Sequence, residues 1–100
     1  MLEYIDRAFE YTAIGRDEFD ADRRTQDAVV RCLTVIGEAA GVLSPATYEQ
    51  IGSLPPHLPR GQRNLLVHEH WKIDLDTVWT TVERDLAAVR ADIEALRAGQ

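Results

Sequence analysis

The segment from Arg63 to His70, RNLLVHEH, gathers the side chains of this sequence that are best suited to acid–base chemistry. It holds a guanidinium at Arg63, a carboxamide at Asn64 and imidazoles at His68 and His70. An imidazole titrates near neutral pH, whereas a guanidinium stays charged and can form two parallel hydrogen bonds to a phosphate. This combination is suited to chemistry at a phosphodiester, although an arginine and a histidine this close are also common as structural residues.

Cleavage of RNA without a metal needs a base that removes the 2′-hydroxyl proton and a cation that stabilises the charge gathering on the phosphate. His68 would be the base or acid and Arg63 the cation, while Asn64 would orient His68 or contact the RNA. On a helix, Arg63 and His68 would lie roughly 140° apart around the axis. Spacing alone leaves several arrangements open: a swung Arg63 side chain, His68 at a helix end, a site completed by a second subunit, or a structural pair without catalysis.

Other chemical groups in the chain favour structural interpretations. His68, Glu69 and His70 resemble a metal cluster, but residues two apart on a helix point away from each other and the HExxH spacing is missing. We therefore expect neither a metal nor a cofactor. Trp71 and Trp79 could stack on bases, although core or interface packing is commoner for such residues. Glu38 could be a buried or inter-helix acid that pairs with Arg63 or a neighbour, but a solvated helix-surface carboxylate is the commoner case. Cys32 is expected to be a small buried hydrophobe.

The overall charge argues against broad nonspecific binding of nucleic acid. The formal net charge is −6 and the pI about 4.9, and such binding depends on Lys and Arg replacing phosphate counterions. However, one short segment contains all three histidines and several basic residues, with Glu69 as its only acid. These residues are His57, Arg60, Arg63, His68, His70 and Lys72. An anion site on an acidic protein is therefore compatible with the sequence.

Length and composition predict one globular domain over residues 1–100. The chain has 100 residues, 45% of them hydrophobic and 28% charged, which is ordinary for a folded domain. A single cysteine excludes an intrachain disulfide, and neither a signal peptide nor a membrane span is apparent. We expect a cytoplasmic location.

The elements that must position the candidate site are expected to be helices. Apolar residues recur every three or four positions from Leu2 to about Ile14, where Gly15 breaks the pattern. The acidic run 16–22 offers Asp17, Asp20 and Asp22 as N-caps for a second helix. The apolar face of that second helix comprises Val29, Val30, Leu33, Ile36, Ala40 and Leu43. A third, short helix would begin with Ser44 as N-cap and Pro45 in its first turn.

The second half of the chain predicts a loop followed by two further helices. Residues 52–59, GSLPPHLP, cannot form regular helix, whereas RGQRNLLVH has helical composition. The strongest helix signal starts after Asp74 as N-cap, with Ile73 and Val78 at hydrophobic-staple positions. Its apolar stripe comprises Leu75, Val78, Val82, Leu86, Val89, Ile93 and Leu96. The predicted fold is all-α, an antiparallel bundle of four main helices plus one short helix.

Several of these segments, in this order, resemble the HepT family of the HEPN superfamily. They are DRRTQDAVVRCLTVIGEAA (22–40), RNLLVHEH (63–70) and WKIDLDTVW (71–79), and the resemblance covers nearly the whole chain. The family signature is an arginine, four to six residues, then a histidine, which Arg63 and His68 match. The resemblance implies a HEPN-like helical bundle, a homodimer with Arg63 and His68 facing a cleft between protomers, and RNA cleavage that leaves a 2′,3′-cyclic phosphate.

The resemblance also implies a toxin that is neutralised by a minimal nucleotidyltransferase antitoxin. In the family, the histidine is often followed two residues later by a tyrosine that receives AMP from the antitoxin. Here that position is His70, so the usual acceptor hydroxyl is missing and silencing by this route is in doubt. Two hypotheses follow: an endoribonuclease toxin, and a noncatalytic subunit that binds the nucleotidyltransferase and a nucleotide. The acidic pI favours the second, and the pairing of Arg63 with His68 favours the first.

Overall fold

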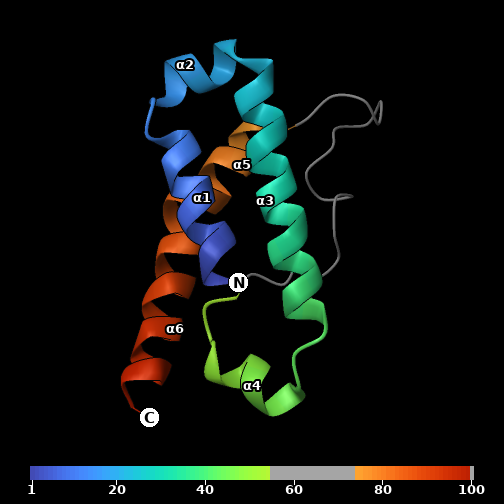
Figure 1. Ribbon diagram of the computed structural model, residues 1–100, viewed down its shortest axis with the longest axis vertical. Coiled ribbons are helices and arrows are strands. Elements are labelled where there is room, and N and C mark those ends of the chain that lie inside the picture. The colour runs from blue at the N-terminus through green and yellow to red at the C-terminus, as the bar shows by residue number, and fades with distance from the viewer. Residues whose placement is uncertain (55–73, 100) are drawn as a thin grey trace.

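The computed structural model describes residues 1–54 and 74–99, and within these ranges the chain is helical and contains no strand (Figure 1). The described helices are α1 (Leu2–Thr12), α2 (Arg16–Ala21), α3 (Arg23–Gly41), α4 (Pro45–Gln50), α5 (Leu75–Thr80), the π-helix η2 (Thr81–Leu86) and α6 (Ala87–Ala98). The expected all-α class is confirmed. The further helix expected around RGQRNLLVH lies outside the described residues.

The first helix follows the predicted apolar spacing. In α1, Ile5 and Ala8 are buried, and the buried hydroxyl of Thr12 donates to the carbonyl of Ala8 at 3.0 Å. Ala13, the next apolar residue on this spacing after Phe9, is exposed and lies just after the end of the helix. Gly15 interrupts the chain as predicted: its φ of 92° lies in the region that L-residues rarely adopt.

The acidic run after Gly15 is a helix of its own, which the sequence analysis did not predict. Helix α2 forms there because Phe19 provides a fully buried anchor, while Asp17 and Glu18 lie in the first turn, where the helix dipole favours negative charge. Of the three acids proposed as N-caps, Asp22 caps α3, since its Oδ1 accepts from the backbone N–H of Arg24 at 3.1 Å. The Thr25 hydroxyl adds a second hydrogen bond to Asp22, at 2.8 Å.

The predictions for α3 and α4 are confirmed. Ser44 caps α4 by accepting from the N–H of Thr47 at 3.2 Å, and Pro45 lies in the first turn. Glu38 is exposed on α3, as expected of a solvated carboxylate, whereas Cys32 is buried. Apolar burial raises the pKa of the Cys32 thiol. The predicted face of α3 is in place: Val29, Leu33, Ile36 and Ala40 are buried, and Val30 is partly buried. Leu43, which is also partly buried, lies after the end of the helix at Gly41.

The last helical arm starts at the predicted cap, but it is not α-helical throughout. Asp74 caps α5, and the backbone at Thr81 and Ala87 keeps right-handed helical angles, so α5, η2 and α6 form one continuous arm. The six residues of η2 have π-helical hydrogen bonds, which the apolar spacing did not reveal. Most of the predicted stripe points into the core: Val78, Val82, Leu86 and Val89 are buried, and Leu75, Ile93 and Leu96 are partly buried.

Helix α1 packs between α3 and the last arm and runs antiparallel to both (Figure 1). All three contribute large, buried core residues: Ile5 from α1, Leu33 and Ile36 from α3, and Leu86 from η2. Phe19 of α2 adds an aromatic contact with Trp79 of α5, with ring centroids 5.3 Å apart. Trp79 thus packs against the core, as the structural interpretation expected. No helix within the described ranges is both long and apolar enough to cross a membrane.

Candidate functional site

The residues predicted to carry the chemistry lie in one part of the chain. Arg63, Asn64, His68 and His70 all fall between Leu54 and Asp74, outside the described residues, so their roles stay predictions. Ile73, proposed as half of a hydrophobic staple, falls there too. Elsewhere in the chain as described, no group of three His, Cys, Asp or Glu side chains could hold a metal ion. The structure does define where the chain enters and leaves this segment.

The entry point is attached to α6. Asp92 accepts two hydrogen bonds through Oδ2, one from the backbone N–H of Ser53 at 3.1 Å and one from the Ser53 hydroxyl at 2.5 Å. The next residue, Leu54, is buried in the core with 5% of its surface exposed. A polar pair and an apolar anchor therefore hold the chain in place just before the candidate segment.

The exit point is the N-cap of α5. Asp74 accepts from the backbone N–H of Thr77 at 3.1 Å and from the Thr77 hydroxyl at 2.7 Å. The Thr77 hydroxyl, followed by the backbone N–H, holds the pKa of the Asp74 carboxyl below its ordinary value because both stabilise the charged form. The first turn of α5 is thus fixed immediately after the candidate segment.

The two attachment points lie at different levels of the last helical arm. Asp92 follows Asp74 by 18 residues along that arm, which at 1.5 Å per residue corresponds to about 27 Å. The described residues on either side of the candidate segment are thus held at Asp92 of α6 and at the start of α5.

A cluster of charged and aromatic side chains holds the start of α5 against α2. The Arg16 guanidinium contacts Asp20 at 2.8 Å and Asp76 at 2.5 Å, and it lies over the Trp79 ring at 5.8 Å. The hydrogen bond to Asp76, followed by the one to Asp20, raises the pKa of Arg16, which stays charged. Because Trp79 also contacts Phe19, this cluster joins α2 to α5, the helix that follows the candidate segment.

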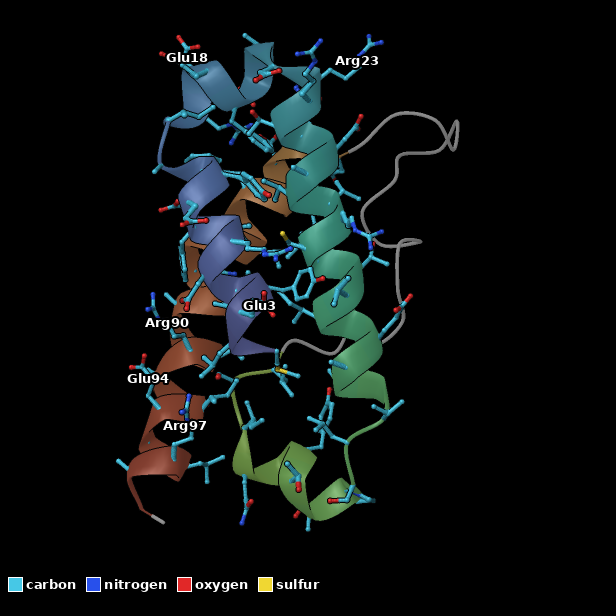
Figure 2. All side chains as sticks on the ribbon, in the orientation of Figure 1. Glu3, Glu18, Arg23, Arg90, Glu94 and Arg97 are labelled. Atoms are coloured by element: carbon cyan, nitrogen blue, oxygen red, sulfur yellow. The ribbon has the colours of Figure 1, made fainter. Side chains whose placement is uncertain are left out.

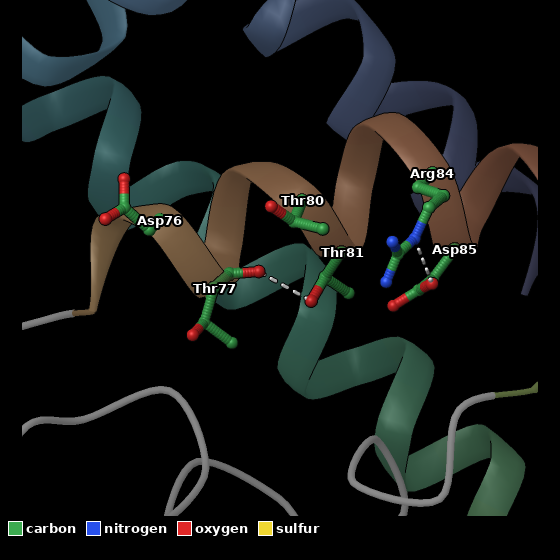
Figure 3. A pocket seen from close by; sticks show the side chains of 6 residues that line it. All are labelled: Asp76, Thr77, Thr80, Thr81, Arg84 and Asp85. Carbon is green, nitrogen blue, oxygen red and sulfur yellow. Dashed lines mark hydrogen bonds and ion pairs between the residues drawn. The ribbon is translucent and has the colours of Figure 1, made fainter.

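A pocket of about 280 Å³ lies along the arm from α5 into η2 (Figure 3). The described residues that line it are Asp76, Thr77, Thr80, Thr81, Arg84 and Asp85. Figure 3 shows the guanidinium of Arg84 and the carboxylate of Asp85 side by side, with N–O separation 3.6 Å. The sequence analysis did not single out these residues, because polar side chains on an outer helix face are ordinary. Their repetition at three- and four-residue spacing next to the candidate segment is the signal that could have found them.

Charge is divided unevenly between the described helices and the candidate segment. The described residues contain sixteen acidic side chains and eight arginines, a net charge of −8, whereas residues 55–73 contain two arginines, one lysine and one acid, a net charge of +2. The charged side chains labelled in Figure 2 lie on the outside of the helices. Several form surface pairs, such as Arg90 with Asp6 at 3.1 Å and with Glu94 at 3.3 Å. The candidate segment is therefore a basic stretch in an acidic protein.

Comparison with known proteins shows that the sequence is similar to those of ribonucleases. Residues 1–96 match the model of a family described as HepT-like, ribonuclease HepT-like. A protein of Methanocaldococcus jannaschii that is named as an RNase by inference is 31% identical over 97 residues, covering 96% of this chain and 80% of the relative. A probable ribonuclease HepT of Thermococcus cleftensis is 32% identical over 102 residues, covering 97% and 89%. No solved structure matches the chain.

Proposed function

This chain belongs to the HepT-like ribonuclease family, and on that premise we propose that it is an endoribonuclease that cleaves RNA without a metal ion. The observation that carries the proposal is the family match over residues 1–96, which includes the whole of RNLLVHEH. The basic charge of that stretch within an acidic protein supports it, because a phosphate backbone would be attracted there.

In the proposed reaction His68 and Arg63 act on one phosphodiester. His68 takes the proton of the 2′-hydroxyl, the 2′-oxygen attacks the phosphorus, and the bond to the 5′-oxygen breaks. The products are a 2′,3′-cyclic phosphate and a 5′-hydroxyl, whose proton an imidazolium supplies. Arg63 stabilises the charge that gathers on the phosphate oxygens in the transition state. Asn64 supports the pair by orienting His68 or by contacting the RNA.

We propose further that the protein acts as the toxin of a toxin–antitoxin pair. A homodimer would bring two copies of the basic segment to one cleft, and a minimal nucleotidyltransferase would be the antitoxin. Because His70 stands where the family often has an AMP-accepting tyrosine, neutralisation here would rely on complex formation or on modification elsewhere.

Incubation of purified protein with RNA in excess EDTA tests the nuclease. We expect fragments with 2′,3′-cyclic phosphate ends from the unaltered chain and none from Arg63→Ala or His68→Ala. Asp27→Ala is the matched control, because Asp27 is exposed on α3 and far from the candidate segment in sequence. Intact RNA, or equal cleavage by all four proteins, would overturn the proposal.

A second candidate function is a noncatalytic subunit that binds a nucleotidyltransferase and a nucleotide. The net charge of −6 favours it, since an acidic protein binds RNA poorly outside a local site. Expression in cells separates the two functions. Growth arrest that His68→Ala relieves supports the nuclease, whereas growth unaffected by either protein supports the noncatalytic subunit.

A further inference from the structure

We propose that the pocket along α5 and η2 binds a nucleotide of the RNA substrate that neighbours the one being cleaved. Arg84 would contact a phosphate of that nucleotide, and Thr80 and Asp85 would contact ribose hydroxyls. The inference rests on the proposed ribonuclease function and deepens it, because it assigns a substrate-binding role to residues outside the Arg63–His68 pair.

The geometry of the arm puts these groups on one face. The lining residues recur at three- and four-residue spacing, which aligns side chains along one side of a helix. The pocket reaches from the first turn of α5 into η2. π-Helical turns are rare and frequently occur at functional sites. The polar groups of the pocket therefore lie along one side of the arm.

The polar groups of the pocket differ in whether they already make hydrogen bonds within the protein. Among the described residues, the Thr77 hydroxyl donates to Asp74 and the Thr81 hydroxyl donates to the Thr77 carbonyl. The exposed hydroxyl of Thr80 and the carboxylate of Asp85, in a side chain that is 23% exposed, have no hydrogen bond in the described part of the chain. These two groups can still bind a ligand.

Arg84 is the least engaged of the ion-paired arginines. Its side chain is 80% exposed and its contact with Asp85 spans 3.6 Å, longer than a hydrogen bond. Arg7, Arg16 and Arg90 all contact a carboxylate at 3.1 Å or less, with side chains 36% to 46% exposed. The guanidinium of Arg84 therefore keeps donors for a phosphate.

The balance of charge in the pocket favours one nucleotide over a polyphosphate. Arg84 is the one arginine in the lining, and of the two carboxylates there Asp76 is already ion-paired with Arg16, so a single phosphate rather than several finds a cation. A ribose instead presents hydroxyl donors that a carboxylate accepts, and the 2′-hydroxyl is the group by which proteins distinguish RNA from DNA. Phosphate at Arg84 and ribose at Asp85 and Thr80 match this lining.

The pocket is also within reach of the proposed reaction centre. Asp76 follows His68 by eight residues, and a fully extended chain spans at most about 3.6 Å per residue. His68 therefore lies within about 29 Å of the near end of the pocket along the chain. One bound strand of RNA can extend over both places.

Binding of RNA to variants in a His68→Ala background tests the inference, because the RNA then stays intact. Fluorescence anisotropy would compare a labelled RNA oligonucleotide with DNA of the same sequence. We expect Arg84→Gln to weaken RNA binding about tenfold, the loss of one charge-assisted contact, and Asp85→Asn to reduce the preference for RNA over DNA. Arg97→Gln is the matched control, since it removes the same charge from an exposed arginine thirteen residues further along the arm (Figure 2).

The outcomes separate this inference from the ribonuclease function itself. If Arg84→Gln and Arg97→Gln bind RNA equally, the pocket is not a substrate site, even where the unaltered chain cleaves RNA. If the unaltered chain neither cleaves nor binds RNA, both proposals fall. If Arg84→Gln instead alters the oligomeric state without RNA, as measured by light scattering, the pocket is a contact between two copies and the inference is overturned.

Discussion

Replacing the N-cap Asp74 by alanine tests how firmly the last helical arm is fixed next to the candidate segment. The substitution removes both hydrogen bonds from Thr77, at 3.1 and 2.7 Å, and leaves the first turn of α5 without its acceptor. Loss of an N-cap typically costs about 1 kcal/mol. For a chain of 100 residues, that corresponds to a melting temperature lower by about 4 to 8 °C.

The acid dependence of stability provides a second measure of the same cap. The folded pKa of Asp74 is lowered, chiefly by the Thr77 hydroxyl. Its contribution to the free energy of unfolding is therefore fully present above the ordinary carboxyl pKa of about 3.9 and is lost as the pH falls through the lower folded value. Asp74→Asn keeps an acceptor but does not titrate, so its stability should decrease less steeply over this acid range.

Thermal unfolding followed by circular dichroism, at neutral pH and through the acid range, measures both effects. Asp27→Ala is the control, because Asp27 is exposed on α3 and makes no hydrogen bond or ion pair within the part of the chain described. The reasoning is refuted if Asp74→Ala melts no lower than Asp27→Ala, or if Asp74→Asn follows the acid curve of the unaltered chain. The pKa of Asp22 is also lowered by Thr25, so Asp22 contributes to the acid dependence of stability equally in every variant.

Two further substitutions test the core and the first turn of the chain. Leu86 is fully buried in η2, so Leu86→Ala leaves a cavity in the core. It should lower the free energy of unfolding, measured by urea denaturation, by about 3 kcal/mol. A decrease below about 1 kcal/mol would contradict the packing described. The Cβ added by Gly15→Ala would meet no atom within 4 Å. The substitution should still destabilise the protein by about 1 to 3 kcal/mol, because φ at this position is 92°. Unchanged stability in the same assay would show that the backbone relaxes.

The sequence predicted most of the helical framework because apolar periodicity and capping act locally. Asp74 and Ser44 were identified as caps, and each accepts from the residue three positions later. Asp22 could not be chosen over Asp17 and Asp20 from the sequence, since all three are good caps. The choice depends on Phe19. Because its side chain is buried against Trp79, residues 16–21 form a separate helix, and the next helix begins only after Asp22.

The π-helix and the pocket were not predictable from the same signals. The apolar spacing from Val78 to Leu86 fits an α-helix as well as a π-helix, because periodicity resolves the face and not the hydrogen-bond pattern. Arg84 and Asp85 look like ordinary surface charges until their position next to Thr80 is known. The roles of Arg63 and His68 stay predictions, based on residue chemistry and on family membership.

Cys32 gives the protein an internal reporter of its own unfolding. It is the only cysteine in the chain, only 2% of its surface is exposed, and it packs in the middle of α3 among the core residues. A thiol reagent can reach it only when α3 separates from its neighbours, and the raised pKa of the thiol further slows reaction in the folded state. The labelling rate therefore measures the population of opened molecules when reclosing outpaces the reagent. Mass spectrometry of this labelled cysteine can thus rank the variants described above by their stability, in native buffer without denaturant.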